Sequence, residues 1–311
     1  MDTQQSPKIP FYVQRPFGEK MNASFDFIKE NWKVMLKYIT YLILPVCLVQ
    51  ALTMNSFMGY YMGAVMGDLS TLEFGDFGAA FFVSYGALVL CGMLGSLLIT
   101  SLVYALVKLY NDREERLNGI TFTDIKPLLF RNIGRLIVLG LVSFGLSIVV
   151  MSVVVLLAVG SLLTLFLTFP ALVAVMIALA VWAPIYLFEN IGIGASLAKA
   201  FRMGFATWGG IFLILLVMGI IASVLQSVLA TPWSMAISIK TLFEYSAEGA
   251  TEGDSSIVYN MFVYVLAIIQ SYGAYISMVF ALLGLSYQYA HASEKLDSIT
   301  VESEIDNFEN L

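Results

Sequence analysis

Four methionines are spaced so that their sulfur atoms could bind a soft metal ion. They recur at every fourth position, at Met54, Met58, Met62 and Met66, and would share one face of a helix. Thioether sulfur suits Cu(I), so copper capture is one hypothesis for this stripe. Methionine also packs adaptably, and the aromatic residues between these positions favour a short amphipathic helix on the outer membrane interface. The sequence leaves both interpretations open.

Other residue types that do chemistry are few and poorly spaced. Glutamates recur every four residues from Glu244 to Glu252, but the stretch lacks the Asp or Asn alternation and the fixed glycine of a calcium loop. Cys47 and Cys91 lie in apolar runs, where a thiol behaves as a small hydrophobe, and His291 is the only histidine. We therefore expect no catalytic residues, no cofactor and no enzymatic activity, and no metal site unless the methionine stripe binds copper.

The elements that carry these residues are predicted membrane spans. Hydrophobic residues make up 59% of the chain and charged residues 12%, which is outside the usual range of soluble domains. A membrane helix needs about 20 apolar residues, and six runs reach that length. They are residues 34–54, 79–109, 136–159, 162–188, 209–229 and 257–289. Because the alternation of barrel strands is absent, the sequence predicts an all-α polytopic bundle of six transmembrane helices.

The basic residues indicate how the spans are oriented. Of the 16 Lys and Arg residues, 15 fall in segments that could share one side of the membrane, and only Lys240 falls opposite. Cytoplasmic segments carry the excess of Lys and Arg, so we expect both termini in the cytoplasm of a bacterium. The third and fourth spans are separated only by Gly160 and Ser161, and merging them would break the alternation. The first run begins too late for a cleavable signal peptide.

Each odd-numbered span is preceded by a short amphipathic stretch, at residues 24–37, 123–135 and 193–208. We name these the collar stretches, and Ser24 and Thr123 are the expected helix caps of the first two. Aromatic and basic side chains at near-helical spacing are typical of helices that lie in the membrane interface. The residues expected to contact lipid headgroups are Trp32, Lys33, Lys37, Arg131, Arg135, Lys199 and Arg202. The alternative is that they simply anchor the spans.

Charged residues avoid the interior of the spans, which argues against a proton relay. Gln226 and Gln270 are the polar side chains expected to face inward, where they would line a path or join helices. Pro170 and Pro184 could kink the fourth span. Small residues recur every four positions in the second and sixth spans, and this spacing predicts close helix contacts. They are Gly92, Ser96 and Thr100, and Gly273, Ser277 and Ala281.

The sequence divides into an amino-terminal segment with a collar helix (1–33), a transmembrane domain (34–290) and an acidic cytoplasmic tail (291–311). The tail could fold against a protein partner, although disorder is the alternative. We expect membrane lipids as partners and no nucleic acid, because no basic patch with stacking aromatics stands apart from the collar stretches. The oligomeric state stays open.

Three segments resemble a group of six-span bacterial membrane proteins. They are residues 25–32 (FDFIKENW), 184–189 (PIYLFE) and 194–202 (GASLAKAFR). In these motifs the chain is similar to the membrane domain found fused to some glycerophosphodiester phosphodiesterases, and to related uncharacterised inner-membrane families. The resemblance covers the membrane part and implies a six-span fold. It supplies no catalytic residues, and this sequence contains no phosphodiesterase domain.

Taken together, these features predict an integral inner-membrane protein that engages lipids or acts as a scaffold through its collar stretches and tail. The alternative is a permease for a neutral or apolar solute, which would need a polar or hollow path near Gln226, Gln270 and Pro184.

Overall fold

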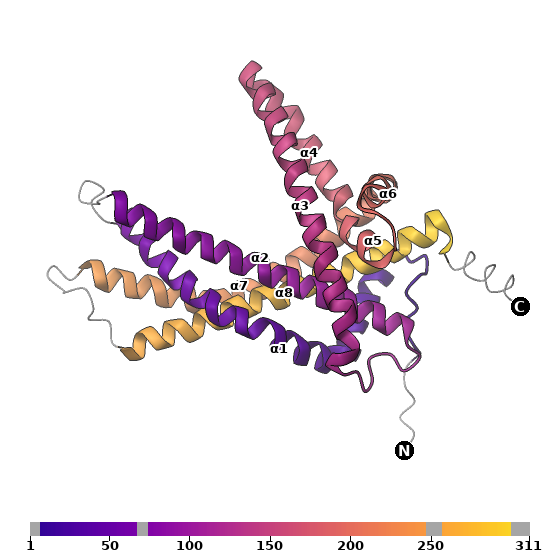
Figure 1. Cartoon of the computed structure of the whole chain (residues 1–311), viewed down its shortest axis with the longest axis horizontal. Coiled ribbons are helices and arrows are strands. Elements are labelled where there is room, and N and C mark those ends of the chain that lie inside the picture. The colour runs from indigo at the N-terminus through magenta and orange to yellow at the C-terminus, as the bar shows by residue number, and fades with distance from the viewer. Residues whose placement is uncertain (1–6, 67–73, 247–256, 300–311) are drawn as a thin grey trace, which may run out of the picture. The chain divides into compact units, whose positions relative to one another are not determined.

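The computed structural model describes residues 7–66, 74–246 and 257–299, and every regular element in these ranges is helical (Figure 1). The elements are α1 (Phe17–Met66), α2 (Phe74–Asp112), α3 (Phe122–Gly160), η1 (Leu162–Thr164), α4 (Leu165–Leu179), α5 (Trp182–Phe188), α6 (Ile193–Ala206), α7 (Trp208–Ser246) and α8 (Ile257–Asp297). Six stretches are long and apolar enough to cross a membrane: Phe17–Met62, Gly78–Asp112, Phe122–Gly160, Leu162–Phe188, Trp208–Leu242 and Ile257–Asp297. The predicted all-α class with six candidate spans is confirmed.

The chain forms two compact units, each assembled from segments that are far apart in the sequence. Unit 1 contains residues 1–36, 100–219 and 280–311, and unit 2 contains residues 37–99 and 220–279. Helices α1, α2, α7 and α8 pass from one unit into the other, whereas α3 to α6 belong to unit 1 alone. Both units therefore depend on long-range helix packing.

The turn between the third and fourth spans is as short as the sequence predicts. Helix α3 ends at Gly160, and Ser161 adopts an extended conformation that turns the chain. The Ser161 Oγ accepts a hydrogen bond from the backbone N–H of Leu163 at 3.3 Å, which caps η1. Figure 1 shows α3 and α4 lying side by side as the resulting hairpin.

The fourth span is interrupted once, and Pro184 explains where. Helix α4 ends at Leu179, and α5 begins at Trp182. Proline has no N–H, so a continuous helix would lack the bond from residue 184 to the carbonyl of Ala180. In the first turn of α5 that N–H is not needed, and the proline is tolerated there. Pro170, by contrast, lies inside α4 without ending it.

Two of the three collar stretches are not separate helices. Residues 24–37 lie inside α1, and residues 123–135 form the beginning of α3. Only the third stretch contains a helix of its own, α6. Continuous backbone hydrogen bonding favours extending a helix over starting a new one, because each new helix needs a costly first turn.

Both predicted helix caps are wrong. Ser24 lies within α1 and donates its hydroxyl to the carbonyl of Lys20 at 2.9 Å, as serine does inside a helix. The cap of α3 is Thr121, whose backbone N–H and hydroxyl both donate to Asp124 Oδ2 at 2.8 Å. A threonine followed three residues later by an acid is a capping-box pattern, and it lies two residues before the predicted Thr123.

Unit 1 has an aromatic core around Phe188, the last residue of α5. The Phe188 ring stacks on Tyr289 of α8 with 5.5 Å between ring centroids, and it meets Tyr104 of α2 edge-on at 5.5 Å. Phe11, from the segment before α1, packs edge-on against Phe188 at 5.3 Å and against Tyr287 at 5.7 Å. These large rings exclude water from the polar groups beside them, which strengthens the electrostatic interactions of those groups.

Unit 2 has a core around Trp233 of α7, which packs with Ala51 of α1 and Ala267 of α8. The indole N–H of Trp233 donates to Asn55 Oδ1 at 2.8 Å. The buried polar atom of the tryptophan is thereby satisfied, as burial in an apolar core requires.

The predicted contacts of small residues are right at Gly273 of α8 and wrong at Gly92 of α2. A Cβ added at Gly273 of α8 would lie 2.4 Å from Leu229 Cδ1 of α7, so this face is a close helix contact. At Gly92 of α2, nothing lies within 4 Å of such a Cβ. The Tyr275 ring packs against Gly95 instead, one turn along α2, where an added Cβ would lie 2.2 Å from the ring. Spacing alone did not reveal which small residue faces the neighbouring helix.

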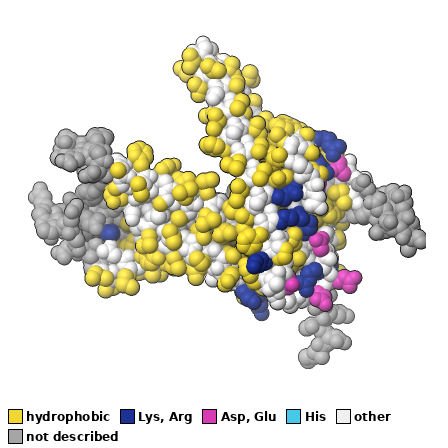
Figure 2. All heavy atoms as spheres, in the orientation of Figure 1, with side chains coloured by type: hydrophobic (Ala, Val, Ile, Leu, Met, Phe, Trp, Pro, Cys, Tyr) yellow, Lys and Arg dark blue, Asp and Glu magenta, His cyan; other side chains and the backbone are white. Residues whose placement is uncertain are grey.

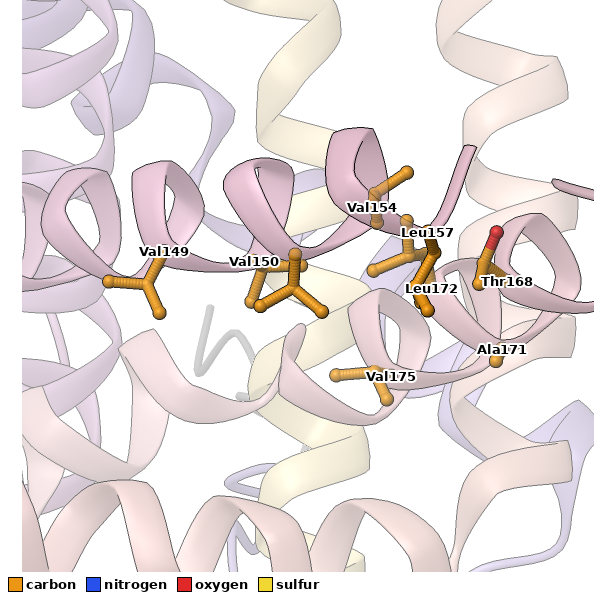
Figure 3. Close-up of a pocket in the computed structure, with 9 residues that line it drawn as sticks. Val149, Val150, Val154, Leu157, Thr168, Ala171, Leu172 and Val175 are labelled. Carbon is orange, nitrogen blue, oxygen red and sulfur yellow. The ribbon is translucent and has the colours of Figure 1, made fainter. Parts of the chain in front are cut away.

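A groove of about 300 Å³ lies along the hairpin of α3 and α4 (Figure 3). Its lining residues are Val149, Val150, Val153, Val154, Leu157, Thr168, Ala171, Leu172 and Val175. Thr168 supplies the single polar side chain of this lining, and its hydroxyl donates to the carbonyl of Thr164 within the same helix at 3.0 Å. The groove offers hydrocarbon contacts and no polar recognition.

Candidate functional site

Glu189, the residue after α5, contacts charged and polar side chains from two other helices. Lys199 Nζ of α6 lies 2.8 Å from Glu189 Oε1 and 2.9 Å from Oε2. Tyr289 of α8 donates its hydroxyl to Glu189 Oε1 at 2.9 Å. Asp297, the last residue of α8, lies 2.7 Å from Lys199 and 2.6 Å from Arg202. We name these five residues the Glu189 cluster.

Most of the Glu189 cluster is shielded from solvent. The side chains of Lys199, Glu189 and Asp297 are 19%, 17% and 17% exposed, whereas that of Arg202 is 62% exposed. Burial lowers the pKa of Lys199, but its hydrogen bonds to Asp297 and Glu189 outweigh burial and leave the pKa above its ordinary value. Lys199 therefore stays charged, and its ion pairs connect the ends of α5 and α8 to α6. A charged, ion-paired lysine does not act as a general base or nucleophile.

Two arginines of α3 hold the backbone on either side of Glu189. Arg131 Nη2 donates to the carbonyl of Leu187 at 3.0 Å. Arg135 Nη2 donates to the carbonyls of Glu189 at 3.1 Å and Ile191 at 2.8 Å. Carbonyls at the end of a helix have no partner within it and attract positive charge, so the arginines stabilise the end of α5.

The segment before α1 packs against the end of α8. The backbone N–H of Arg15 donates to His291 Nδ1 at 3.0 Å, and the Arg15 guanidinium donates to the carbonyls of Phe11, at 3.2 Å, and Pro10. Burial lowers the pKa of Arg15 and raises the pKa of Tyr12. The one histidine of the chain thus accepts a backbone hydrogen bond, which is a structural role.

A buried cation joins α1 to α8. Lys20 Nζ donates to Gln288 Oε1 at 2.7 Å, and the two residues are 4% and 0% exposed. The Gln288 amide rests on Gly210 of α7, where an added Cβ would lie 2.9 Å from Nε2. Within the part of the chain that the structure describes, no carboxylate lies within 4 Å of Lys20. A neutral amide is a weak partner for a buried charge, so this contact depends on accurate packing of three helices.

Unit 2 buries a polar group that the sequence analysis missed. Tyr275 of α8 donates its hydroxyl to Gln50 Oε1 of α1, and this hydroxyl lies 3.3 Å from the carbonyl oxygen of Cys91 on α2. The hydroxyls of Thr40 and Tyr272 share a second hydrogen bond between α1 and α8. The available signal was a glutamine in the apolar first span, which in lipid must find a partner.

The two glutamines predicted to line a path lie on different helices. Gln226 is exposed on α7. Gln270 is partly buried on α8, and its Oε1 is buried without a hydrogen-bond partner among the described residues. No hydrogen bond joins these two side chains in the described part of unit 2. Their lining role stays a prediction.

The seven residues predicted to contact lipid headgroups fall into two groups. Trp32, Lys33 and Lys37 have exposed side chains on α1, and Lys33 Nζ lies 5.7 Å from the centre of the Trp32 ring. The other four bond within unit 1, as described above; they are Arg131, Arg135, Lys199 and Arg202. Lipid contacts of either group stay a prediction.

The methionine stripe lies on α1, as a helical spacing requires. Met54 and Met58 pack against the apolar core of unit 2, which favours the packing interpretation for these two residues. The side chain of Met66, residues 247–256 with the acidic Glu248, Glu252 and Asp254, and residues 300–311 lie outside the described residues. Where the structure describes the chain, no three His, Cys, Asp or Glu side chains are grouped to hold a metal ion.

No known protein family, no curated protein and no solved structure matches this chain. The function must therefore be inferred from the geometry and charge of its own residues.

Proposed function

We propose that this chain is a multi-pass protein of a bacterial inner membrane, with both termini in the cytoplasm, that engages anionic lipids or scaffolds a partner without catalysing a reaction. The observation that carries the proposal is the distribution of charge. All Lys and Arg residues except Lys37 and Lys240 belong to unit 1. In Figure 2 most of the visible Lys and Arg side chains lie over elements of unit 1. The positive-inside rule places such segments on the cytoplasmic side.

Exposed aromatic residues of unit 1 support contact with a membrane surface. Trp32 of α1 is 52% exposed beside Lys33, and α6 exposes a stacked pair, Phe201 and Phe205, with 6.2 Å between ring centroids. Aromatic rings next to basic side chains are typical of segments that lie among lipid headgroups. The resemblance to membrane domains associated with glycerophosphodiester phosphodiesterases accords with this proposal.

Two experiments test the proposal. In a chain whose Cys47 and Cys91 are replaced by alanine, a membrane-impermeant maleimide should label Lys8→Cys only in inside-out vesicles and Lys240→Cys only in right-side-out vesicles. The opposite labelling would overturn the orientation. For lipid engagement, the purified chain should unfold at a higher temperature in nanodiscs that contain phosphatidylglycerol than in pure phosphatidylcholine. Equal unfolding temperatures would remove the lipid part of the proposal.

A permease for a neutral solute is the second candidate, and the polar group of unit 2 is what favours it. Gln50 and Tyr275 meet inside the apolar spans, and the Gln270 carbonyl has no partner among the described residues. Neutral polar groups at membrane depth can bind a solute without a charged residue. Uptake of a neutral solute into liposomes that depends on Gln270 would favour this candidate over the first.

A further inference from the structure

Three cations of unit 1 lie near the ends of three spans that we predict to share one membrane border. Lys108 lies near the end of the second apolar run, and Arg135 directly precedes the third. The fourth apolar run ends with α5, and Arg131 and Arg135 donate to backbone carbonyls at and just after this end. Arg131 and Arg135 are four residues apart and share one face of α3. Asn132, next to Arg131, donates its side-chain amide to the carbonyl of Ser101 on α2 at 3.1 Å, which packs α3 against the helix that carries Lys108. Lys108 lies within electrostatic reach of both arginines. We name Lys108, Arg131 and Arg135 the α2–α3 basic cluster.

These cations differ from those of the Glu189 cluster in having no acidic partner. Lys199 and Arg202 each contact a carboxylate within 3 Å. Among the described residues, no carboxylate lies within 4 Å of any member of the α2–α3 basic cluster, and Asp112 is the acid within electrostatic reach of Lys108. Partly buried cations within electrostatic reach of one another repel, and a bound anion offsets that repulsion.

Several hydrogen-bond donors of the cluster have no partner in the described structure. Arg131 and Arg135 bond to backbone carbonyls through Nη2. The Nε atoms of both are buried without a partner, and Lys108 Nζ makes no hydrogen bond among the residues that the structure describes. Tyr186 lies under Arg135, with 4.0 Å between the guanidinium carbon and the ring centre, which fixes the plane of that guanidinium.

We propose that the α2–α3 basic cluster binds the phosphate of one anionic phospholipid in the cytoplasmic leaflet. This inference rests on the proposed function and names the site and the chemical group that it recognises. Guanidinium and ammonium groups bind phosphate strongly, and basic pockets between spans on the cytoplasmic side are suited to lipid headgroups. A lipid is favoured over free phosphate because the cluster lies at the ends of apolar runs, at the depth that headgroups occupy.

The test is the affinity for phosphatidylglycerol of the full chain in nanodiscs, compared among three variants. Lys108→Gln removes a cluster charge without breaking a hydrogen bond, and binding should weaken about fivefold, since each basic residue near the surface contributes about 1 kcal/mol. Lys126→Gln is the matched control, because Lys126 is exposed on α3 and lies outside the cluster. It should change binding less than twofold. Lys108→Arg keeps the charge and should retain binding, which separates loss of the site from misfolding.

The possible outcomes separate the site from the broader function. If Lys108→Gln and Lys126→Gln weaken binding equally while the wild-type chain prefers phosphatidylglycerol, the specific site is overturned and general lipid engagement stands. If the wild-type chain shows no preference for phosphatidylglycerol over phosphatidylcholine, both are overturned. If inorganic phosphate stabilises the chain in neutral micelles as well as phosphatidylglycerol does, and Lys108→Gln abolishes that effect, assignment to a lipid is overturned in favour of a soluble phosphate.

Discussion

Replacing Glu189 by glutamine tests whether the Glu189 cluster holds unit 1 together. The substitution keeps the shape of the side chain and an oxygen that can accept from Tyr289, but it removes the negative charge that faces Lys199. Hydrogen bonds to charged groups contribute about 1.5 to 3 kcal/mol, whereas exposed ion pairs contribute less than about 1 kcal/mol. The Glu189 and Lys199 side chains are 17% and 19% exposed, so their ion pair should contribute more than an exposed pair and less than a fully buried one.

We expect Glu189→Gln to lower the free energy of unfolding by about 2 kcal/mol, a roughly 30-fold change in the unfolding equilibrium. The loss should stop short of the value for a fully buried pair, because Lys199 keeps Asp297 at 2.7 Å. Reversible unfolding in mixed micelles, followed by circular dichroism, measures the change. The matched control is Glu114→Gln, an exposed glutamate with no hydrogen bond or ion pair in the described structure, which should stay within about 0.5 kcal/mol of the wild type.

A double-mutant cycle isolates the contribution of the pair. If Glu189 and Lys199 interact as the distances indicate, the effects of Glu189→Gln and Lys199→Gln should be non-additive by about 1 kcal/mol. Additivity within about 0.3 kcal/mol would refute the reasoning, since it would mean that the ion pair contributes nothing beyond the separate side chains.

Three further perturbations follow from the same contacts. Deleting residues 292–311 should destabilise the chain by about 3 kcal/mol more than deleting 298–311, because the longer deletion also removes the buried Ala292 and Ser293 and the Asp297 carboxylate paired with α6. Equal stability of both truncations would contradict this. In α6, Gly204→Ala should lower the free energy of unfolding by about 2 kcal/mol, because the added Cβ would lie 2.2 Å from a backbone carbonyl oxygen. Gly194→Ala is the control, since nothing lies within 4 Å of its added Cβ, and it should not lower the free energy of unfolding in the same assay. The ion pairs raise the pKa of Lys199, so their stabilisation is present below the ordinary value of 10.5 and is lost as the pH rises through the higher folded value. The stability difference between the wild type and the Lys199→Gln variant should therefore be constant to about pH 10 and shrink above it, and a difference that grows with pH would be the wrong sign.

Part of the candidate site was visible in the sequence. Arg131, Arg135, Lys199 and Arg202 were singled out because basic residues next to apolar runs are expected at a membrane border. Their partners were not foreseen. Glu189 and Asp297 are separated by more than a hundred residues, and no local pattern shows that the ends of α5 and α8 meet.

The boundary of the predicted tail also depends on a contact that the sequence did not reveal. An acidic composition after residue 290 predicted an accessory segment, but α8 continues to Asp297, and Ala292 and Ser293 are buried. Helix α8 extends because its last turn meets the positive charges of α6, a contact supplied by another element. Composition reports the solvent preference of a segment, whereas its boundary depends on what packs against it.

The sequence by itself determined the helical class, the six apolar stretches and the tight turn at Ser161, because apolar length acts locally along the chain and the distribution of Lys and Arg requires separate third and fourth spans. Only the tertiary structure decided which polar groups meet: Glu189 with Lys199, Lys20 with Gln288, and Gln50 with Tyr275. Each of these pairs joins different helices, and the packing of small residues such as Gly95 and Gly210 sets how closely the helices approach. Helix packing depends on the shapes of both surfaces at once, and that information is not contained in either segment alone.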